Sequence, residues 1–204
     1  MTEKVEKASS YPLIQQGNVQ AELLEEWTSR FQDLEKSNLP SYCMPIRWGS
    51  DFDHGQQWWV APVLINPGWT GLTTHQKKSD LEKLNNCLSS IYPRTHKALS
   101  NLQKDNRIHY VAYSTLFPGS ILSYHKHNNP SHSKFHCLMH PTNRCGLMQT
   151  KRSSSGKAIK AIHHWRETGE WVVFNDNDYH SAWNLSSAPR TVLLIDGHTE
   201  HLSN

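Results

Sequence analysis

The sequence predicts an α+β fold that is mainly β, with helices in the first half of the chain and a β sandwich or jelly roll in the second. Three observations predict this order. The 204 residues suffice for one domain with a sizeable core. Apolar residues recur at helical spacing in the first half. Later, short runs rich in β-branched and aromatic residues alternate with turn residues about every ten positions.

The first part of the chain is expected to be an arm followed by a helix. Residues 1–17 are polar and aperiodic, and we interpret them as a loose arm with a short extended piece near residues 11–14. In residues 19–34, apolar side chains follow one another at steps of three and four, which predicts an amphipathic helix. Extended chain is expected over residues 43–48 and 58–65.

Two further helices are predicted before the β region. Ser79 and Glu82 have the spacing of a capping box, so a helix begins there. Pro93 ends that helix, and a short third helix is expected over residues 95–102. Residues 18–104 would thus form a helical and extended support region.

The second half of the chain is expected to be the β core, which would carry the functional site. Residues 105–204 complete the single domain, residues 1–204. Eight short strands are predicted in this half, at residues 108–116, 120–124, 134–140, 146–150, 158–164, 170–174, 181–185 and 191–196.

Composition and charge exclude several classes of protein. The formal net charge is +3 and the 21 Lys and Arg residues are scattered, so we expect no nucleic-acid partner. The four cysteines form no CxxC pair, which favours neither a zinc ribbon nor a disulfide framework. Without a signal peptide or an apolar run of membrane-spanning length, we expect a cytoplasmic protein with no membrane partner.

Histidines are the candidate metal ligands, since the chain has 14 of them. His125 and His127 are two positions apart, and on a strand such residues face the same way. His180 follows a polar turn much later in the chain. Imidazoles from two distant strands that converge in a β barrel suit iron, copper or zinc. The alternative is that His-x-His arises by chance in a histidine-rich chain.

The usual non-haem iron site combines two histidines with one carboxylate, and here the carboxylate is not obvious. The His-x-Asp position holds His127. Asp176 and Asp178 are close to His180 in the sequence, but Asn-Asp-Asn-Asp is also ordinary turn chemistry, which we favour. Arg190 begins an apolar run, where it is either a surface residue or the buried partner of an anion such as a carboxylate.

Several spacings hold together in one pattern. Ser114 lies four residues before the Pro118-Gly119 turn, and His125 lies seven residues after the proline. Phe174-Asn175-Asp176 leads to His180, and Arg190 follows ten positions later. In this respect residues 113–198 resemble the aspartyl/asparaginyl β-hydroxylases, which are Fe(II)- and 2-oxoglutarate-dependent oxygenases with a double-stranded β-helix fold.

The resemblance implies roles for individual residues. His125 and His180 would bind Fe(II), and Arg190 with Ser114 would hold the distal carboxylate of 2-oxoglutarate. At the two family positions that contact the cosubstrate, where an arginine and a histidine are usual, this chain has Lys134 and His136. Some family members have glycine where this chain has His127, so His127 is either a third metal ligand or a partner of a metal-bound water.

The function that these residues favour is hydroxylation of an unactivated C–H bond in an amino acid or short peptide, with Fe(II), 2-oxoglutarate and O2. Two alternatives stay open. A cupin-type iron dioxygenase would use the three histidines His125, His127 and His180 without 2-oxoglutarate. A non-catalytic jelly-roll module would bind a metal only for structural stability.

Overall fold

The structure is a computed structural model, and it describes residues 14–18, 25–26, 46–48, 58–66, 78–104, 108–127, 132–140 and 143–198. The described helices are α2 (Lys78–Ile91) and α3 (Pro93–Lys104). The described strands are β1 (Ile14–Asn18), β2 (Ile46–Trp48), β3 (Trp58–Ile65), β4 (Ile108–Leu116), β5 (Ile121–His125), β6 (His132–Leu138), β7 (Cys145–Arg152), β8 (Ala158–His164), β9 (Glu170–Asn175), β10 (Tyr179–Asn184) and β11 (Arg190–His198).

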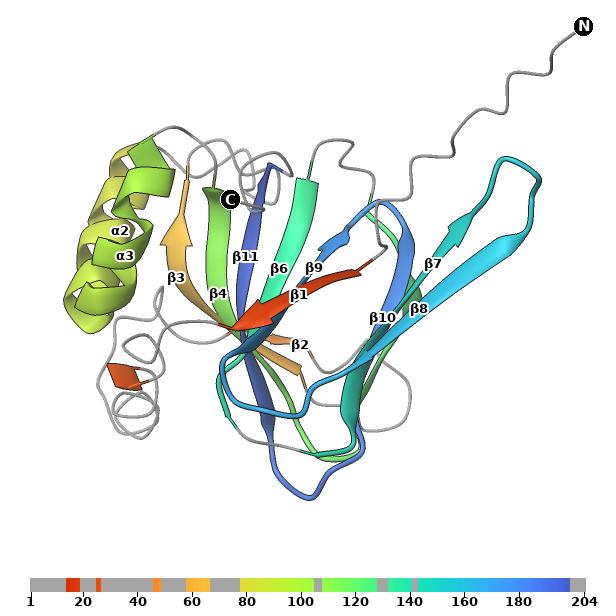
Figure 1. The fold of residues 1–204 in the computed structure, drawn as a ribbon. Coiled ribbons are helices and arrows are strands. Elements are labelled where there is room, and N and C mark those ends of the chain that lie inside the picture. The colour runs from red at the N-terminus through yellow and green to blue at the C-terminus, as the bar shows by residue number, and fades with distance from the viewer. Residues whose placement is uncertain are drawn as a thin grey trace, which may run out of the picture.

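The strands form two antiparallel sheets that face each other as a jelly roll (Figure 1). The larger sheet has the order β1-β9-β6-β11-β4-β3-β2, and the smaller one has the order β5-β10-β7-β8. Strands that alternate between the two sheets along the chain bring residues from distant segments into one interior. The expectation of a mainly β jelly roll with flanking helices is therefore confirmed.

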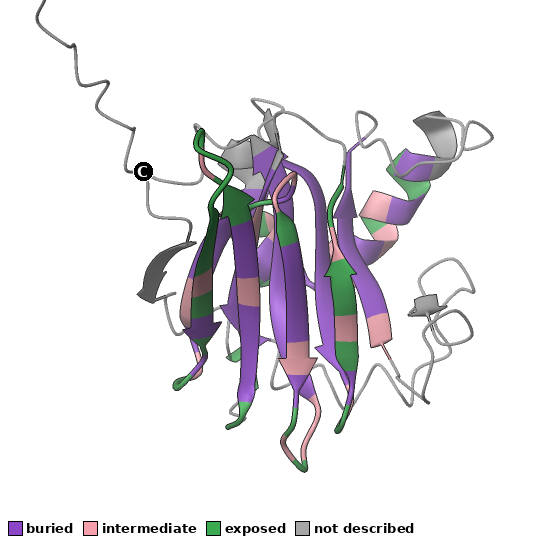
Figure 2. Ribbon diagram, turned by 90° about the vertical axis from the view of Figure 1, so that its right-hand side faces the viewer, coloured by how far each residue is buried: buried purple, intermediate pink, exposed green. Residues whose placement is uncertain are grey.

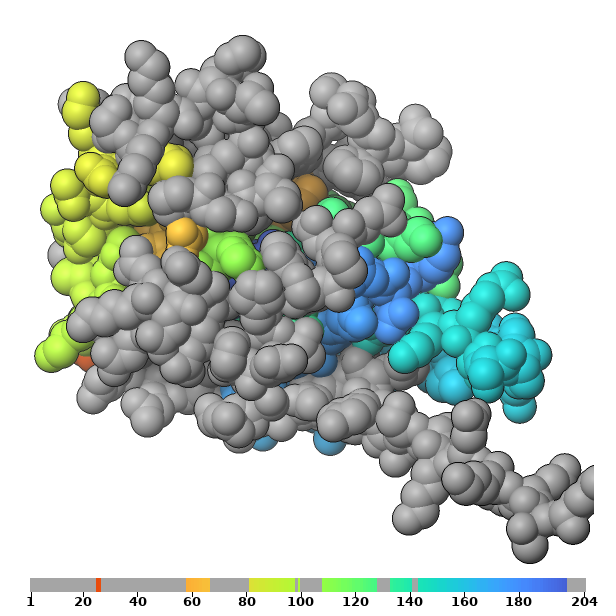
Figure 3. Space-filling view, turned by 90° about the horizontal axis from the view of Figure 1, so that it is seen from above, coloured from red at the N-terminus to blue at the C-terminus, as the bar shows by residue number. Residues whose placement is uncertain are grey.

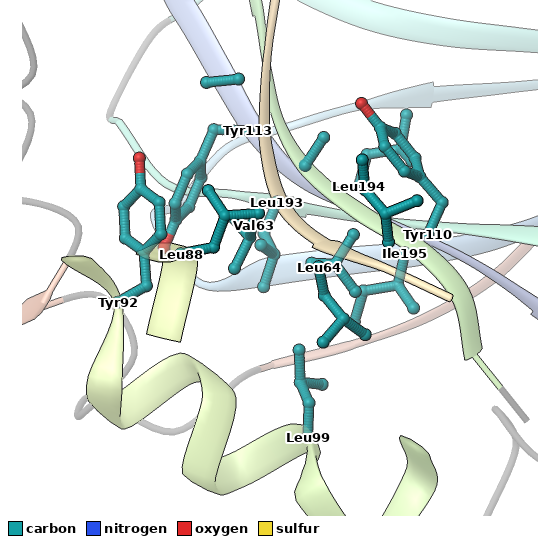
Figure 4. Packing of buried hydrophobic residues seen from close by; sticks show 14 of the residues in the cluster. Val63, Leu64, Leu88, Tyr92, Leu99, Tyr110, Tyr113, Leu193, Leu194 and Ile195 are labelled. Atoms are coloured by element: carbon teal, nitrogen blue, oxygen red, sulfur yellow. The ribbon is translucent and has the colours of Figure 1, made fainter. Parts of the chain in front are cut away.

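The two helices cover the outer face of the larger sheet next to β3 and β4 (Figure 1). Apolar residues of the helices and of β3, β4 and β11 form one cluster, in which Leu64, Leu88, Tyr92, Tyr113 and Leu193 are at most 1% exposed (Figure 4). The asparagine side chain of Asn85 fastens α2 to β3 through hydrogen bonds to the backbone of Ile65, of 3.0 Å and 2.7 Å.

A second apolar cluster lies between the two sheets. It includes Leu138, Leu147, Trp165, Phe174 and Val192, all nearly inaccessible to solvent. Because neighbouring residues of a strand face opposite ways, Leu193 of β11 packs on the helix side while Arg190 and Val192 face the interior. The smaller sheet closes this interior. Its central strands β10 and β7 are mostly buried, whereas most residues of its outer strands β5 and β8 are exposed or half-buried (Figure 2).

The order of the elements follows the sequence-based expectations closely. All eight strands of the second half are present, and those at 108–116 and 158–164 have the expected bounds. The strand expected at 134–140 begins two residues earlier, at His132. Both helices expected after residue 78 are present, and Pro93 starts α3, as its missing N–H permits at a first helical position.

Some expectations fall on residues outside the described ranges. The helix predicted over residues 19–34 is described only at residues 25–26, which are helical. The extended segment predicted at 43–48 is described from Ile46, where β2 begins. Residues 11–13 of the expected extended piece lie outside the described ranges. Ile14 begins β1, which pairs with β9, so the expected loose arm was wrong for residues 14–17, which belong to the larger sheet.

The structure also describes the cysteines and the membrane-spanning potential of the helices. The three described cysteines, Cys87, Cys137 and Cys145, are free thiols. Cys137 is fully buried, and burial raises the pKa of its thiol to about 12. Neither described helix combines the length and the hydropathy that a membrane span requires.

Candidate functional site

Three histidines meet at one end of the jelly-roll interior. His125 ends β5 and is paired directly with His180 of β10 in the smaller sheet. His127 follows two residues later, and its backbone N–H donates to the carbonyl of Asp176 at 3.0 Å. One ligand nitrogen from each of the three rings lies within 4.8 Å of the others. The expectation that His125 and His127 face one centre with His180 therefore agrees with the geometry.

Two of these histidines are oriented by backbone carbonyls. Nδ1 of His125 lies 2.5 Å from the carbonyl oxygen of Ser123, and Nδ1 of His180 lies 2.9 Å from that of Asp178. A carbonyl can only accept, so Nδ1 carries the proton in both rings, and Nε2 of each presents its lone pair. This arrangement is usual around metal-ligating histidines, because the second nitrogen fixes the tautomer and the ring orientation.

Burial keeps the innermost histidine neutral. His180 is 6% exposed, and this burial lowers its pKa to about 3 despite the hydrogen bond to the carbonyl of Asp178. Burial likewise lowers the pKa of the half-exposed His127, although the carboxylate of Asp176 opposes the effect. A neutral imidazole is the form that binds a metal ion, so no proton has to be displaced from His180 at neutral pH.

Asp176 is the carboxylate of this site. Its backbone lies in the turn after β9, as its sequence predicted, but its side chain is fully buried rather than solvated. Oδ1 lies 3.6 Å from Nε2 of His180 and 3.8 Å from Nε2 of His127. The interpretation of the Asn-Asp-Asn-Asp segment as turn chemistry was therefore incomplete, because the carboxylate lies against the ligand nitrogens of two histidines.

Lys134 is held beside Asp176 rather than in the depth of the interior. Its ammonium lies 2.7 Å from Oδ2 of Asp196 on β11 and 3.6 Å from Oδ2 of Asp176. Asp196 and Lys134 are cross-strand partners, so the pair is fixed by the register of β6 and β11. Lys134 thus compensates two buried carboxylates next to the histidines.

A buried cation, Arg190, lies between the two sheets. Arg190 is fully buried, and none of its three guanidinium nitrogens has a hydrogen-bond partner among the residues that the structure describes. Its guanidinium carbon lies 4.3 Å from the ring centre of Trp165, whose own buried Nε1 also has no acceptor in that part of the chain. Burial lowers the pKa of Arg190 to about 10, so the group stays charged at neutral pH.

His136 lies between Arg190 and the histidine cluster. Its ring lies 5.0 Å from Phe174, which lies 5.1 Å from His180, and 6.4 Å from Trp165 on the other side. Burial and then the charge of Arg190 hold the pKa of His136 well below its usual range. The two ring nitrogens of His136 make no hydrogen bond within the described residues. A row of aromatic rings therefore connects the histidine cluster with the buried arginine.

Ser114 lies on the same interior face, since it pairs with Val192 of β11, two residues from Arg190. Its hydroxyl oxygen accepts a hydrogen bond of 2.8 Å from Nε1 of Trp58. The hydroxyl hydrogen remains available as a donor. Trp58 thus orients the hydroxyl of Ser114.

The structure gathers every predicted site residue into one interior. His125, His127 and His180 form the cluster, Lys134 and His136 face inward from β6, and Ser114 and Arg190 lie on the inner face of β4 and β11. Sequence reasoning missed Asp196 and Trp165 as members of the site. The alternation of β11 carries a signal for Asp196, because it lies an even number of residues from Arg190 on the same strand.

The arrangement can hold a metal ion and a small anion together. Imidazole nitrogens and a carboxylate are ligands for iron, zinc and similar ions. The buried guanidinium and indole N–H are donors without acceptors among the described residues, and an anion would supply such acceptors. A dicarboxylate that binds a metal at one end and Arg190 at the other has the required chemistry.

Two solved structures are similar to the chain in fold. The chain is similar to the non-haem alpha ketoglutarate dependent carbocyclase SnoK from nogalamycin biosynthesis, with 9% identity, a TM-score of 0.58, and coverage of 91% of this chain and 79% of that one. It is also similar to the epimerase SnoN from the same biosynthesis, with 11% identity, a TM-score of 0.54, and coverage of 91% and 78%. At these identities the similarity shows the fold, which is the jelly roll described above.

A sequence-based family model identifies the particular group. The model of the aspartyl/asparaginyl β-hydroxylases matches residues 22–199, nearly the whole chain, and the protein belongs to that family. A search among curated proteins finds no match. The family expected from the spacings of Ser114, His125, His180 and Arg190 is thereby confirmed.

Proposed function

We propose that the protein is an Fe(II)- and 2-oxoglutarate-dependent oxygenase that hydroxylates an unactivated C–H bond of an amino acid or peptide. The single observation that carries the proposal is the guanidinium of Arg190, which is fully buried, charged and without a hydrogen-bond acceptor in the described residues. A buried charge of this kind costs several kcal/mol unless an anion pairs with it, by the usual order of magnitude. Membership of the hydroxylase family supports 2-oxoglutarate as that anion, and so do SnoK and SnoN, which are both named as alpha ketoglutarate dependent enzymes.

The residues of the chain would divide the cosubstrate between two ends. Arg190 would bind the distal carboxylate through two parallel N–H donors, with the hydroxyl of Ser114 and Nε1 of Trp165 as further donors. His136 lies between Arg190 and the histidines. Burial keeps His136 neutral, so its ring can donate one hydrogen bond without adding charge. Lys134 would act at longer range, because Asp196 already holds its ammonium.

The metal would be held by Nε2 of His125 and His180, the nitrogens that the two backbone carbonyls leave free. Bound Fe(II), 2-oxoglutarate and O2 together supply the oxidising chemistry, which yields succinate, carbon dioxide and the alcohol. In that chemistry the protein contributes positioning and exclusion of water. His127 would be a third ligand or the partner of a metal-bound water, and Asp176 lies close enough to orient either one.

A second candidate follows from the same cluster. Three histidine nitrogens within 4.8 Å of one another also suit a cupin-type iron site that does not use 2-oxoglutarate. That function would give the donors of Arg190 and Trp165, which have no acceptor among the described residues, no ligand to bind. We therefore favour the first proposal.

Anaerobic reconstitution tests the proposal. The protein is loaded with Fe(II) and titrated with 2-oxoglutarate while the visible metal-to-ligand charge-transfer band is recorded. The proposal expects a band that saturates in the parent protein and is absent from Arg190→Ala at the same concentrations. Fe(II) binding by the parent without a band would favour the three-histidine site, and no Fe(II) binding would exclude both enzymes.

A further inference from the structure

Acidic residues are absent from a long segment of this chain. Residues 106–166 contain nine Lys and Arg and no Asp or Glu, whereas the remaining residues have twelve Lys and Arg against all eighteen Asp and Glu. The scattered basic residues and the small net charge of +3 therefore conceal a strong asymmetry. The segment includes β4 to β8, so its charge belongs to the β core.

Four of these cations lie on one projecting ribbon, formed by the ends of β7 and β8 and the turn between them. From Lys151 to Lys160 every residue is exposed except Ser153, which is half-buried. The cations are Lys151, Arg152, Lys157 and Lys160. The ribbon extends outward beside β10 in Figure 1 and protrudes from the molecule in Figure 3.

Backbone pairing and turn hydrogen bonds fix the conformation of the ribbon. Lys151 pairs with Ile159 and Arg152 pairs with Ala158 across the two strands. At the turn, Gly156 adopts a positive φ of 78° that glycine tolerates, and its N–H donates to the carbonyl of Ser153 at 2.9 Å. The N–H of Ser153 donates to the carbonyl of Lys157 at 2.8 Å. The cations are therefore presented at fixed spacings.

The ribbon begins at the histidine cluster. Gln149 of β7 pairs directly with His180, and Thr150 pairs with Tyr179, the first residue of β10. At about 3.3 Å per strand residue, Lys151 and Arg152 lie roughly 7 and 10 Å beyond Gln149. Lys151 is on the same sheet face as Gln149 and His180, because residues two apart on a strand face the same way.

We propose that the β7–β8 ribbon binds carboxylate side chains of an extended acidic peptide whose reacting residue lies at the histidine cluster. This inference rests on the proposed function and specifies its substrate class. A peptide in extended conformation also advances about 3.3 Å per residue, so the cations would meet acidic side chains two to four residues from the reacting one. A free amino acid is too short to reach from the cluster to Arg152.

A peptide suits the ribbon better than a nucleic acid does. Long nucleic acids bind to stripes of many cations, whereas here four cations stand at one side of a reaction site. Beyond Thr150, β7 has β8 as its only partner strand among the described elements, and within them its other edge has no strand against which an extended peptide would compete. Hence both the charge and the backbone of the ribbon match an acidic peptide.

Fluorescence anisotropy of labelled peptides tests the proposal without requiring turnover. The probes are a fluorescein-labelled decapeptide with four glutamates and its glutamine counterpart, each with the full-length protein. We expect the glutamate peptide to bind at least about tenfold more tightly, and its affinity to fall with rising salt because exposed charges are screened. The variant K151Q/R152Q/K157Q/K160Q should remove that preference.

A matched control uses lysines on the opposite side of the molecule. Lys83 of α2 and Lys97 of α3 are exposed, and K83Q/K97Q should keep the preference for the glutamate peptide. Circular dichroism with equal unfolding midpoints establishes that both variants are folded. Equal affinity for both peptides, or an equal loss in the control variant, would overturn the proposal.

Two further measurements relate the ribbon to the site. Paramagnetic Mn(II) bound in place of iron broadens the proton resonances of nearby residues. The strongest broadening should fall on the peptide residue that lies two to four positions from the glutamates. Uniform broadening along the peptide would contradict the proposal. Tighter binding of single-stranded RNA or of phosphatidylserine vesicles than of the peptide, lost in the ribbon variant, would assign the ribbon to another partner. Failure of the iron and 2-oxoglutarate titration is a separate result, since the anisotropy measurement uses neither ligand.

Discussion

The two faces of the seven-stranded sheet differ in whether their buried side chains have partners in the described chain. The outer face packs against α2 and α3 through apolar side chains such as Leu64, Leu88 and Leu193, which are almost wholly buried. The inner face carries Arg190 and His136, whose buried nitrogens make no hydrogen bonds within the described chain. The same strands supply both sets of residues at alternate positions. Folding therefore buries the apolar side chains of the outer face, whereas the polar side chains of the inner face would gain hydrogen-bond partners from a ligand.

This difference separates stability from function on a single sheet. Apolar burial on the helix side contributes roughly 25 cal/mol per Å² to folding. Buried donors on the inner side cost about 1–3 kcal/mol each while they lack an acceptor. A ligand that supplies acceptors recovers this cost and stabilises the folded protein in proportion to its concentration. Variants on the two faces should accordingly have opposite signatures.

The largest effect is expected for Arg190→Met. Loss of the guanidinium should weaken 2-oxoglutarate binding by about a hundredfold or more, because truncating a buried charge partner costs 2–5 kcal/mol. Without cosubstrate the same variant should unfold at a higher temperature than the parent, since an unpaired buried charge is gone. Differential scanning calorimetry with and without 2-oxoglutarate measures both effects.

The exposed Arg166 provides the matched control, since Arg166→Met removes the same group from the surface. It should leave both the cosubstrate shift and the unfolding temperature close to those of the parent. A lower unfolding temperature of Arg190→Met in the absence of cosubstrate would mean that Arg190 is already stabilised, and the comparison of the faces would fail.

A stability change without a binding change is expected for Leu88→Ala on the helix side. Leu88 is 1% exposed, and removing a buried leucine side chain costs about 2–5 kcal/mol. Urea unfolding should record this loss, while the affinity of the folded variant for 2-oxoglutarate stays that of the parent. Leu185→Ala is the control, because Leu185 is 45% exposed and should cost less than about 0.5 kcal/mol.

The inner face should also make stability depend on pH. The pKa of His136 is held well below its usual range by burial and by Arg190, so the unfolded chain binds its proton more readily. The folded state should therefore lose stability as the pH falls below about 6.5, by up to about 1.4 kcal/mol per pH unit. His180, whose pKa is lowered to about 3, adds a slope of the same sign.

His136→Gln removes one titrating group from the interior and should flatten the pH dependence of urea unfolding between pH 6.5 and 5, by the same linkage relation. His164→Gln, at an exposed position of β8, is the matched control and should leave the slope as it is. An unchanged slope in His136→Gln would show that His136 has an acceptor or a proton in the folded protein.

Much of this fold was predictable because local chemistry determines it. The helical spacing before residue 104 and the short apolar runs after it predicted α2, α3 and eight strands, and the spacings around His125, His180 and Arg190 predicted the site and its family. The contacts of Asp176 and Lys134 were not predictable in the same way. Lys134 and Asp196 are 62 residues apart, and they meet only because β6 and β11 pair in one particular register.

The smallest effect is expected for Glu26→Gln, which tests whether the helix side is independent of the interior. Glu26 is 4% exposed, and its two carboxylate oxygens accept the backbone N–H groups of Arg94 and Thr95 at 2.6 and 2.7 Å, in the first turn of α3. The first N–H groups of a helix have no partner within the helix, and a negative charge there is favourable. An amide retains one acceptor oxygen and no charge, so the variant should lose about 1 kcal/mol in urea unfolding.

Glu25→Gln is the natural comparison, because Glu25 is exposed and pairs with the side chain of Arg94 at 2.6 Å. A surface ion pair of this kind contributes at most about 1 kcal/mol, and often nothing measurable. The variants should therefore differ in stability and agree in 2-oxoglutarate affinity. If Glu26→Gln also weakened the binding of 2-oxoglutarate, the position of α3 would be coupled through β4 to Ser114. The two faces of the sheet would then be one mechanical unit, and only the chemistry of their side chains would distinguish them.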